Sequence, residues 1–359
     1  MNLNKLVIAD FGTSNSDIAA FPHFQQVHSF PTVIFYDQTG NIEIGEEALQ
    51  KAGTGDLIWI KTSARLEEEE LKRHPDAFTE FVELSLRRIK LQKDNIDLMM
   101  SEPIDMTPYA RQKIIEQLKE IKTIKRVYFL PEPIGTAFSA EFEEKCILVD
   151  IGDGNTSVQA FQGKAPVLAK VRTGRKLVAS QTFRGGRTMT FTTAEILAEM
   201  CGIELNVTDA GSEDYKYMIQ LKHKILSEEH EVTVIDETKK LKVIQITTEM
   251  QKRIISCLFS PAYDYPPVHQ AIWDTAFTVR DLSTQLIQKI WLTGKPFTSE
   301  AVYFHFSVML REHLREDLGK LGIHSIEIKR LSNFSHSVVD GMKKIGPRLQ
   351  KESTKWIDL

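Results

Sequence analysis

Two short turns of the chain combine one acid, glycines and small polar side chains in the same order. The first begins at Asp10 and reads DFGTSNS, and the second begins at Asp150 and reads DIGDGNT. Backbone N–H groups and hydroxyls in such turns suit phosphate oxygens, while carboxylates suit Mg²⁺. The pattern therefore predicts two phosphate-binding turns whose acids serve a metal ion. Each turn taken alone is also consistent with an ordinary β-hairpin, because Asp, Gly, Ser and Asn are common turn residues.

The two turns belong to longer stretches that resemble each other from end to end. Residues 6–21 align with 146–161, with the matching pairs Asp10/Asp150, Gly12/Gly152, Asn15/Asn155, Ser16/Thr156 and Phe21/Phe161. Internal self-similarity usually records repeated architecture. We therefore expect two related α/β halves, each with one Asp-x-Gly turn between two strands.

Composition restricts the class of protein. The chain has 359 residues and a net charge of −4, which allows two domains with sizeable cores and supplies no basic field for nucleic acid. We expect domains at 1–145 and 146–359. Cys146, Cys201 and Cys257 are widely spaced and odd in number, as in reduced core residues. Without a signal-like start or an apolar stretch of about 18 residues, the sequence predicts a cytoplasmic protein with no transmembrane segment.

Strand and helix patterns alternate along the rest of the chain, which favours α/β layers. Residues 30–49 indicate strand, turn, strand and helix. The other expected elements include strands within 95–104 and at 302–308, a helix that begins with Thr107 and Pro108, and a helix within 335–346 that Gly346 and Pro347 end.

In this order the motifs resemble the actin, DnaK-type chaperone and sugar-kinase superfamily of nucleotide-binding proteins. The resemblance rests on the first turn, Glu-Pro-x-x-x-Ala from Glu132, the second turn, and a Gly-Gly pair before a helix at 185–186. It implies two related domains of actin-like (ribonuclease H-like) fold with a nucleotide cleft between them, and ATP or ADP with Mg²⁺ as ligands. In length the chain is closest to bacterial actin-like proteins of the MreB, MamK and ParM type, whereas residues 30–49 resemble a segment of DnaK-type chaperones.

The resemblance implies a role for each motif. The first phosphate loop comprises Asp10, Gly12, Thr13, Ser14 and Ser16, and the second comprises Asp150, Gly152, Gly154, Asn155 and Thr156. Asp10 and Asp150 hold Mg²⁺ through its waters and count with Glu132 as catalytic residues. Gly185 and Gly186 let the backbone approach the nucleotide; a plain turn is the alternative.

Glu132 falls where bacterial actins place the residue that positions the attacking water. A simple charge at a helix N-terminus is the alternative explanation. Glu102 and Asp105 are the next candidates for the same role.

The sequence also departs from the family pattern. Ser157 stands where the second loop usually ends in an acid, and Asp153 stands where glycine is typical. Gln220 and His223 occupy usual Glu and Lys positions, for which Lys222 or Lys224 are substitutes. The Gly-Gly turn that normally follows the late strand is missing, because the strand expected at 302–308 offers His305, Phe306 and Ser307 instead. Lys61 vaguely matches a phosphate-facing chaperone lysine, but a surface role is the simpler interpretation.

These observations predict an actin-like protein that binds ATP, hydrolyses it slowly and uses it to control filament assembly. A DnaK-like chaperone or regulatory ATPase without a peptide-binding domain, and a degenerate nucleotide-binding scaffold, stay open as alternatives. The expected partner is a second copy of the chain, with no direct contact to nucleic acid, and the sequence names no protein adaptor.

Overall fold

The computed structural model shows a mixed α/β protein that divides into two compact units. It describes residues 4–60, 73–91, 93–104, 106–171, 174–182, 184–205, 207, 212–227, 230–235, 240–261, 266–279, 283–332, 336–352 and 355–359. The first unit combines Met1–Ala140 with His336–Leu359, and the second comprises Glu141–Ser335. The C-terminal segment His336–Leu359 therefore belongs to the first unit. The expected domain at 146–359 had included this segment in the second.

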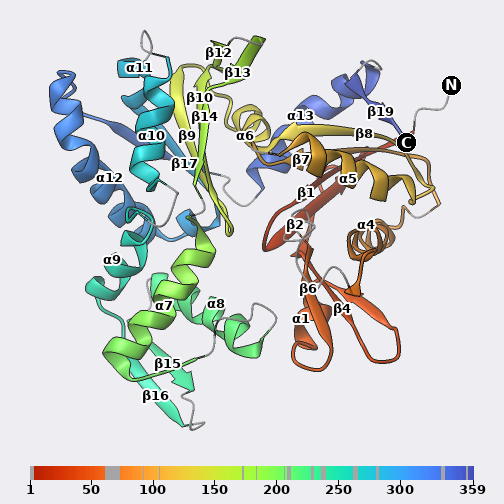
Figure 1. Ribbon diagram of the computed structural model, residues 1–359, viewed down its shortest axis with the longest axis horizontal. Coiled ribbons are helices and arrows are strands. Elements are labelled where there is room, and N and C mark those ends of the chain that lie inside the picture. Colours follow the sequence, from red (N-terminus) through yellow and green to blue (C-terminus); the bar gives the residue numbers. More distant parts are fainter. Residues whose placement is uncertain are drawn as a thin grey trace. The chain divides into compact units, whose positions relative to one another are not determined.

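The first unit is built on a six-stranded sheet in the order β19-β8-β7-β1-β2-β3 (Figure 1). Its strands are β1 (Lys5–Phe11), β2 (Asn15–Ala20), β3 (His28–Pro31), β7 (Ile96–Glu102), β8 (Ile124–Pro131) and β19 (Ile357–Asp358). β1 forms an antiparallel hairpin with β2 and runs parallel to β7, which runs parallel to β8. The buried apolar run from Leu6 to Ala9 suits a strand that is covered on both faces.

Helices cover both faces of this sheet. They are α4 (Ala77–Arg88), α5 (Pro108–Lys119), α6 (Glu132–Ala140) and α13 (Ser337–Lys351). Because side chains alternate along a strand, Val7 joins a core with α4 and α5, whereas Ile8 joins a core with α13. The expected start of α5 is confirmed, since Thr107 accepts a hydrogen bond from the Ala110 N–H at 3.1 Å.

A smaller three-stranded sheet in the order β5-β4-β6 completes the first unit. Its elements are β4 (Val33–Tyr36), β5 (Ile42–Ile44), α1 (Glu46–Gln50) and β6 (Asp56–Trp59). The Asp37 carboxylate accepts hydrogen bonds from the backbone of Thr39 and Asn41 and so closes the turn between β4 and β5. The strand, turn, strand and helix expected within 30–49 are confirmed.

Polar contacts hold α13 to the sheet at both ends. At its start, His336 Nδ1 lies 2.9 Å from Asp17 Oδ2. Near its end, the Gln350 amide donates to Asp97 Oδ2 at 2.8 Å. Asp97 is fully buried and forms a bidentate pair with Arg126. Although burial by itself raises the pKa of Asp97, hydrogen bonds led by that of Arg126 bring it below its ordinary value.

The expectation that Gly346 and Pro347 end this helix is wrong, because α13 continues to Lys351. Proline lacks the N–H that would bond to the fourth preceding carbonyl. Packing on the sheet compensates, since Gly346 lies so close to β1 that a Cβ on it would come within 3.1 Å of the Leu6 side chain. Burial against the sheet therefore sets the length of α13.

The second unit repeats the strand order of the first (Figure 1). Its main sheet consists of β9 (Lys145–Ile151), β10 (Thr156–Gln162), β11 (Ala165–Pro166), β14 (Ala179–Thr182), β17 (Lys289–Thr293) and β18 (Glu327–Arg330). β9 forms an antiparallel hairpin with β10 and runs parallel to β17, which runs parallel to β18. The order β3-β2-β1-β7-β8 therefore corresponds to β14-β10-β9-β17-β18, as the internal repeat predicts.

The two hairpins also share their pairing register. The paired residues are Asp10/Asp17 and Phe11/Ser16 in the first hairpin and Asp150/Ser157 and Ile151/Thr156 in the second. Residues that match in the sequence alignment therefore occupy equivalent positions in the two sheets.

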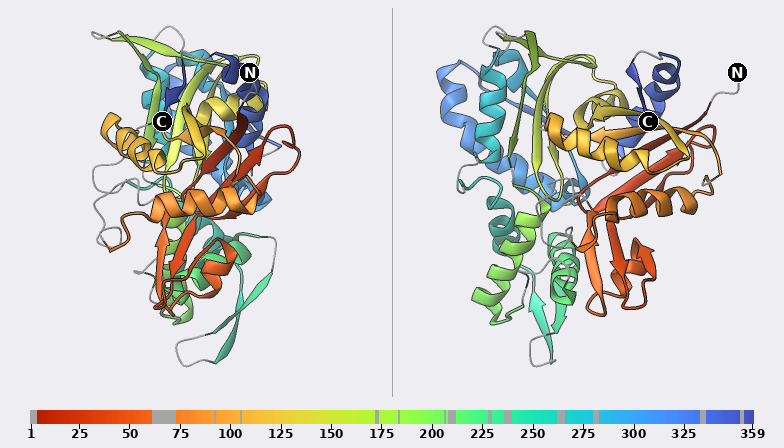
Figure 2. Two further views of the ribbon diagram at one scale, coloured as in Figure 1. Left: turned by 90° about the vertical axis from the view of Figure 1, so that its right-hand side faces the viewer. Right: turned by 45° about the vertical axis from the view of Figure 1, so that its right-hand side comes forward.

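Helices and two ribbons complete the second unit. The helical elements are α7 (Gly186–Cys201), α8 (Glu213–Leu226), α9 (Thr248–Ser256), α10 (Val268–Phe277), α11 (Ser283–Ile287), the 3₁₀ turn η2 (Lys295–Thr298) and α12 (Glu300–Lys320). β12 (Leu168–Val171) pairs with β13 (Gly174–Leu177) in one ribbon, and β15 (Glu231–Ile235) pairs with β16 (Leu241–Gln245) in the other (Figure 2).

The expected strand at 302–308 is wrong, because α12 contains this segment. Its sequence permits a strand interpretation, since apolar and more polar residues alternate. In the structure Val302, Phe306 and Leu310 are buried, and their spacing of four residues is that of one helix face. Ser299 caps the helix by accepting a hydrogen bond from the Val302 N–H at 3.2 Å.

Two expectations from composition can be compared with the structure. Cys146, Cys201 and Cys257 are free thiols, and burial raises the pKa of Cys146 and Cys257 to about 12. Within the described residues, no helix combines the length and apolar character that crossing a membrane requires.

The contact between α6 and α13 predicts that Gly341→Ala destabilises the protein. A Cβ at Gly341 would overlap the backbone carbonyl of Gly135 on α6, so that one helix has to move. We expect a loss of about 1–3 kcal/mol in the free energy of unfolding, the usual cost of overpacking, measured by urea denaturation. In the matched control Gly319→Ala on α12, the new Cβ meets nothing within 4 Å and should stabilise the helix by about 0.5–1 kcal/mol. Equal effects of the two changes would contradict the close packing.

Candidate functional site

The first Asp-x-Gly turn joins β1 to β2. Gly12 is required because a Cβ on it would lie 2.6 Å from the Asn15 carbonyl oxygen. Ser16 is fully buried, and its hydroxyl forms a 2.8 Å hydrogen bond with that of Thr32. Ser16 therefore supports the turn from inside, whereas Gly12, Thr13 and Ser14 form its partly exposed part.

A row of polar side chains crosses the sheet of the first unit beside this turn. Ser101 Oγ donates to Asp10 Oδ1 at 2.5 Å, and Ser29 Oγ donates to Asp17 Oδ1 at 2.5 Å. The second oxygen of Asp17 bonds with His336. These contacts fix both carboxylates at the end of the hairpin. Asp17 was not singled out from the sequence, although its alignment with Ser157 was a signal that the two halves differ here.

Two further acids lie at the carboxyl ends of β7 and β8, where parallel strands commonly carry functional groups. Glu102 ends β7 and is 4% exposed, and Glu132 begins α6 directly after β8. Arg111 of α5 donates from Nε to Glu102 Oε2 at 2.9 Å and from Nη2 to Oε1 at 2.5 Å. Burial raises the pKa of Glu102, Arg111 opposes that shift, and the nearby Glu132 carboxylate adds to it.

In the second unit, the Asp-x-Gly turn and the glycine pair form one feature. The Gly186 N–H donates to the Gly152 carbonyl at 2.9 Å, and the Arg187 N–H donates to the Asp153 carbonyl at 2.7 Å. A Cβ on Gly185 would lie 2.6 Å from the Gly152 carbonyl oxygen. Because Gly185 has a φ of −165°, which any residue adopts, the close approach and not the backbone conformation selects glycine. The structure thus brings Gly152, Gly185 and Gly186 together at the start of α7.

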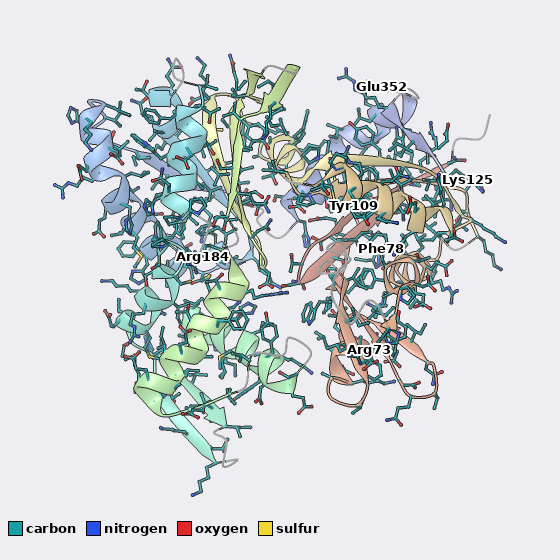
Figure 3. All side chains as sticks on the ribbon, viewed as in Figure 1. Arg73, Phe78, Tyr109, Lys125, Arg184 and Glu352 are labelled. Carbon is teal, nitrogen blue, oxygen red and sulfur yellow. The ribbon has the colours of Figure 1, made fainter. Side chains whose placement is uncertain are left out.

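Thr156 supports the second turn as Ser16 supports the first. It is fully buried, and its hydroxyl donates to the carbonyl of Arg184 at 2.5 Å. Arg184 lies just before α7 (Figure 3). Gly154 and Asn155 are partly exposed, and the Asn155 carbonyl accepts a 2.9 Å hydrogen bond from the Gly152 N–H.

Lys222 is the lysine of α8 that reaches this turn. It is 5% exposed, and its Nζ donates to the Gly186 carbonyl and to Thr190 Oγ1, both at 2.8 Å. Burial lowers the pKa of Lys222, Asp153 opposes this shift, and Lys295 adds to it. Lys224, the other candidate, is exposed, as are Gln220 and His223.

Asp153, the unexpected acid of the second turn, lies among cations. Its Oδ2 is 4.0 Å from Arg187 Nε, and it is an electrostatic neighbour of Lys222. Its negative charge is therefore balanced within the second unit. An acid whose charge is balanced in this way repels a nearby phosphate less than an isolated acid would.

Three buried side-chain atoms beside the start of α7 have no close hydrogen-bond partner among the described residues, namely Arg184 Nε, Arg187 Nε and Tyr215 Oη. Arg187 nevertheless interacts electrostatically with Asp153 and with Tyr215. Tyr215 is 1% exposed, and burial together with Asp153 raises its pKa to about 12. Buried polar atoms are nearly always paired in native proteins, so this location suits a polar ligand. The sequence analysis did not select Tyr215. Its position on the same helix as Lys222 is the only sequence feature that could have pointed to it.

The strand that pairs with β9 late in the chain is β17, whereas residues 302–308 belong to α12. β17 runs parallel to β9, with Thr293 opposite Asp150, and Gly294 follows it. Gly294 has a φ of 111°, and a Cβ on it would overlap the Ile151 carbonyl. A single glycine therefore follows this strand, with Lys295 after it, and no Gly-Gly pair stands here. The signal was the apolar run IWLT before Gly294.

Each turn supplies donors that fit a hydrated Mg²⁺ and phosphate. Mg²⁺ usually keeps several waters and needs only one or two carboxylates, and each unit offers one such acid in its turn, Asp10 in the first and Asp150 in the second. Across the described part of the chain, no group of three or more His, Cys, Asp or Glu residues could hold a metal ion. Lys61 and Asp105 lie outside the described residues.

The packing of the glycine pair predicts that Gly185→Ala disrupts the second turn. The new Cβ would press on backbone atoms of Gly152, Asp153 and Asn155, and we expect a loss of about 1–3 kcal/mol in unfolding free energy. Gly152→Ala is the matched control, since its Cβ would lie 3.2 Å from the Asn155 carbonyl oxygen and should cost less. Chemical denaturation of both variants measures the difference, and a larger loss in the control would contradict the assigned packing.

Comparisons with known proteins leave the family of the chain open. A scan against models of known protein families and a search of curated protein sequences both found no match. The function therefore has to be inferred from the turns and the acids described above.

Proposed function

We propose that the protein binds ATP or ADP with Mg²⁺ through its two Asp-x-Gly turns and hydrolyses ATP slowly, as a member of the actin-like group. The observation that carries this proposal is the repeat itself. In both units the acid lies at the end of a strand that pairs with a hairpin partner on one side and a parallel strand on the other. A hairpin does not in general require an acid at this position. The same placement of an acid and a glycine turn in both units therefore indicates a shared function.

The second unit offers the features that suit a nucleotide best. Gly185 and Gly186 begin a long helix, whose N-terminus favours negative charge. Lys222 provides a buried amine beside Gly186, and Tyr215 and Arg187 provide further buried polar atoms near Asp153. Together they would accept a phosphate or a sugar hydroxyl.

The proposal divides the turn residues into two groups. Thr13, Ser14, Gly154 and Asn155 are partly exposed, and we assign them to the phosphates. Ser16 and Thr156 are buried in hydrogen bonds to Thr32 and the Arg184 carbonyl, and we assign them to the support of the turns. Mg²⁺ would neutralise the charge that develops on the phosphates.

Glu132 is our candidate for positioning the attacking water. A carboxylate at the first residue of a helix, directly after a strand, is held at a defined place. It could orient a water or accept its proton. Self-association into filaments stays a prediction from the sequence.

Nucleotide binding should depend on both acids. We expect Asp10→Asn and Asp150→Asn each to weaken Mg²⁺-dependent ATP binding at least about tenfold, since an interaction with a charged group contributes roughly 1.5–3 kcal/mol. Isothermal titration calorimetry with and without Mg²⁺ measures the change. Asp94→Asn is the control, because Asp94 forms an exposed ion pair with Lys5, which contributes little. No binding to the unmutated protein at millimolar ATP would reject the proposal.

Hydrolysis should depend on Glu132 much more than binding does. Residues that orient or deprotonate a nucleophile contribute about 10²- to 10⁴-fold, and we expect Glu132→Gln to reduce the turnover rate by such a factor with an unchanged ATP affinity. Phosphate release measures the rate, and the exposed Glu116→Gln on α5 is the control. Binding without hydrolysis in the unmutated protein would favour a degenerate scaffold. An unchanged rate in Glu132→Gln would transfer the role to another group, with Glu102 next.

A further inference from the structure

We propose that the outer edge of β16 pairs with the same edge of a second copy of the chain, so that two β15–β16 ribbons join into one four-stranded antiparallel sheet. This contact goes beyond the proposed function, because it uses neither Asp-x-Gly turn and needs no nucleotide. The ribbon lies at the end of the second unit that is remote from the main sheet of that unit (Figure 1). Its register, its edge and the symmetry of that edge together favour the pairing.

The inner face of the ribbon fixes its register. Val232, Val234 and Ile244 are buried in the hydrophobic core of the second unit. Lys242, which pairs with Val234 across the ribbon, lies on the same face and donates to the Cys201 carbonyl. A shift of either strand by one residue would turn these side chains outward, so the residues at the outer edge are defined.

The hydrogen-bond pattern of the ribbon shows which backbone groups point outward from β16. The Ile246 N–H donates to the His230 carbonyl at 2.9 Å, so these two residues form a hydrogen-bonded pair. Such pairs alternate with non-bonded pairs along antiparallel strands, and the register continues unbroken along the ribbon. The N–H and C=O groups of residues 241, 243 and 245 therefore point away from β15.

The two edges of the ribbon differ in what covers them. On the β15 side, the outward N–H of Ile235 donates to Tyr217 Oη of α8 at 2.8 Å. On the β16 side, no further strand pairs with the ribbon in the described part of the chain. Leu241 and Val243 are 73% and 57% exposed at this edge, and β16 contains no proline, while its lysine is on the inner face. Because natural proteins usually block exposed edges with charges, prolines or bulges, this edge is suited to accept another strand.

A second copy is the occupant that the edge itself specifies, because the outward residues are symmetric about Val243. Antiparallel pairing around a twofold axis places Val243 opposite Val243 of the partner subunit, and Leu241 opposite Gln245 of the partner subunit. All outward N–H and C=O groups of residues 241, 243 and 245 then have partners. The two valines form an apolar cross-strand pair, and no two charged residues stand opposite each other, an arrangement that would oppose pairing.

The symmetry of the contact limits the assembly to two chains. A twofold contact uses the same patch on both copies and closes on itself, so it produces a dimer and no filament. β16 has five residues, and a contact between strands of this length is small compared with stable protein interfaces. We therefore expect a weak dimer, which a covalent trap detects most sensitively.

The test is disulfide cross-linking of cysteine variants at the edge, in a Cys201→Ala background that removes the native thiol that is not buried. Residues that form a hydrogen-bonded pair across antiparallel strands have Cα atoms about 5.5 Å apart, within the range that a disulfide spans. Val243→Cys should therefore form a covalent dimer under a mild oxidant and without nucleotide, as measured by non-reducing gel electrophoresis.

Leu241→Cys is the matched control on the same edge. Leu241 is more exposed than Val243, but its two copies would lie about 14 Å apart, four residues along the strand at about 3.4 Å each. Leu241→Cys alone should therefore not cross-link, and neither should Gln245→Cys alone. A mixture of these two variants should cross-link, because the two positions stand opposite each other. Random collision predicts the reverse order, with the more exposed position reacting fastest.

Reversible association supplies a second readout. We expect sedimentation equilibrium to show that the unmutated protein moves from monomer toward dimer as its concentration rises. Val243→Lys should weaken the dimer at least about tenfold, because it brings two like charges together at the twofold axis. Thr233→Lys is the matched control, since Thr233 is exposed on the same face but belongs to β15, away from the edge.

The outcomes decide for or against this edge. Cross-linking of Leu241→Cys as fast as that of Val243→Cys, or a dimer that Val243→Lys leaves intact, would overturn the assigned pairing. A protein that stays monomeric and gives no Val243→Cys dimer would overturn the second copy as the occupant, with a strand of a different protein as the alternative. None of these measurements uses ATP, so a failure of the proposed nucleotide binding would leave their result unchanged.

Discussion

The antiparallel pairing within each hairpin is the constraint on which both units depend. It places Asp10 opposite Asp17 and Asp150 opposite Ser157, at the end of a strand whose apolar residues are buried on both faces. A shift by one residue would turn every apolar side chain to the other face. Because the hydrophobic core resists such a shift, the strand pairing itself holds each of the two acids at the start of its turn.

Close contacts between backbone segments fix the positions of neighbouring elements in both units. Gly185 lies against the second turn, Gly294 lies against Ile151, and Gly341 lies against Gly135. At each place a side chain would occupy space that another backbone fills. The start of α7, the end of β17 and the packing of α13 on α6 are therefore determined by contact distances.

Charge is handled differently in the two units. The first unit balances Glu102 with Arg111 and gives Asp17 hydrogen bonds from Ser29 and His336. The second unit buries Lys222 near Asp153. The equivalent hairpin positions, Asp17 and Ser157, carry a charge in one half only. The repeat thus preserves the backbone and the two turn acids, while the charges around them have diverged.

The sequence by itself determined the features that neighbouring residues enforce. Both hairpins, the Thr107 cap and the glycine turn before α7 follow from local periodicity and turn chemistry. Only the tertiary structure decided the features that depend on distant contacts. The segment at 302–308 alternates like a strand, yet core packing of Val302 and Phe306 makes it helical. The bond from Lys222 to Gly186, and the bidentate pair of Arg111 with Glu102, arise because folding brings separate elements within hydrogen-bond distance, and no local pattern encodes that distance.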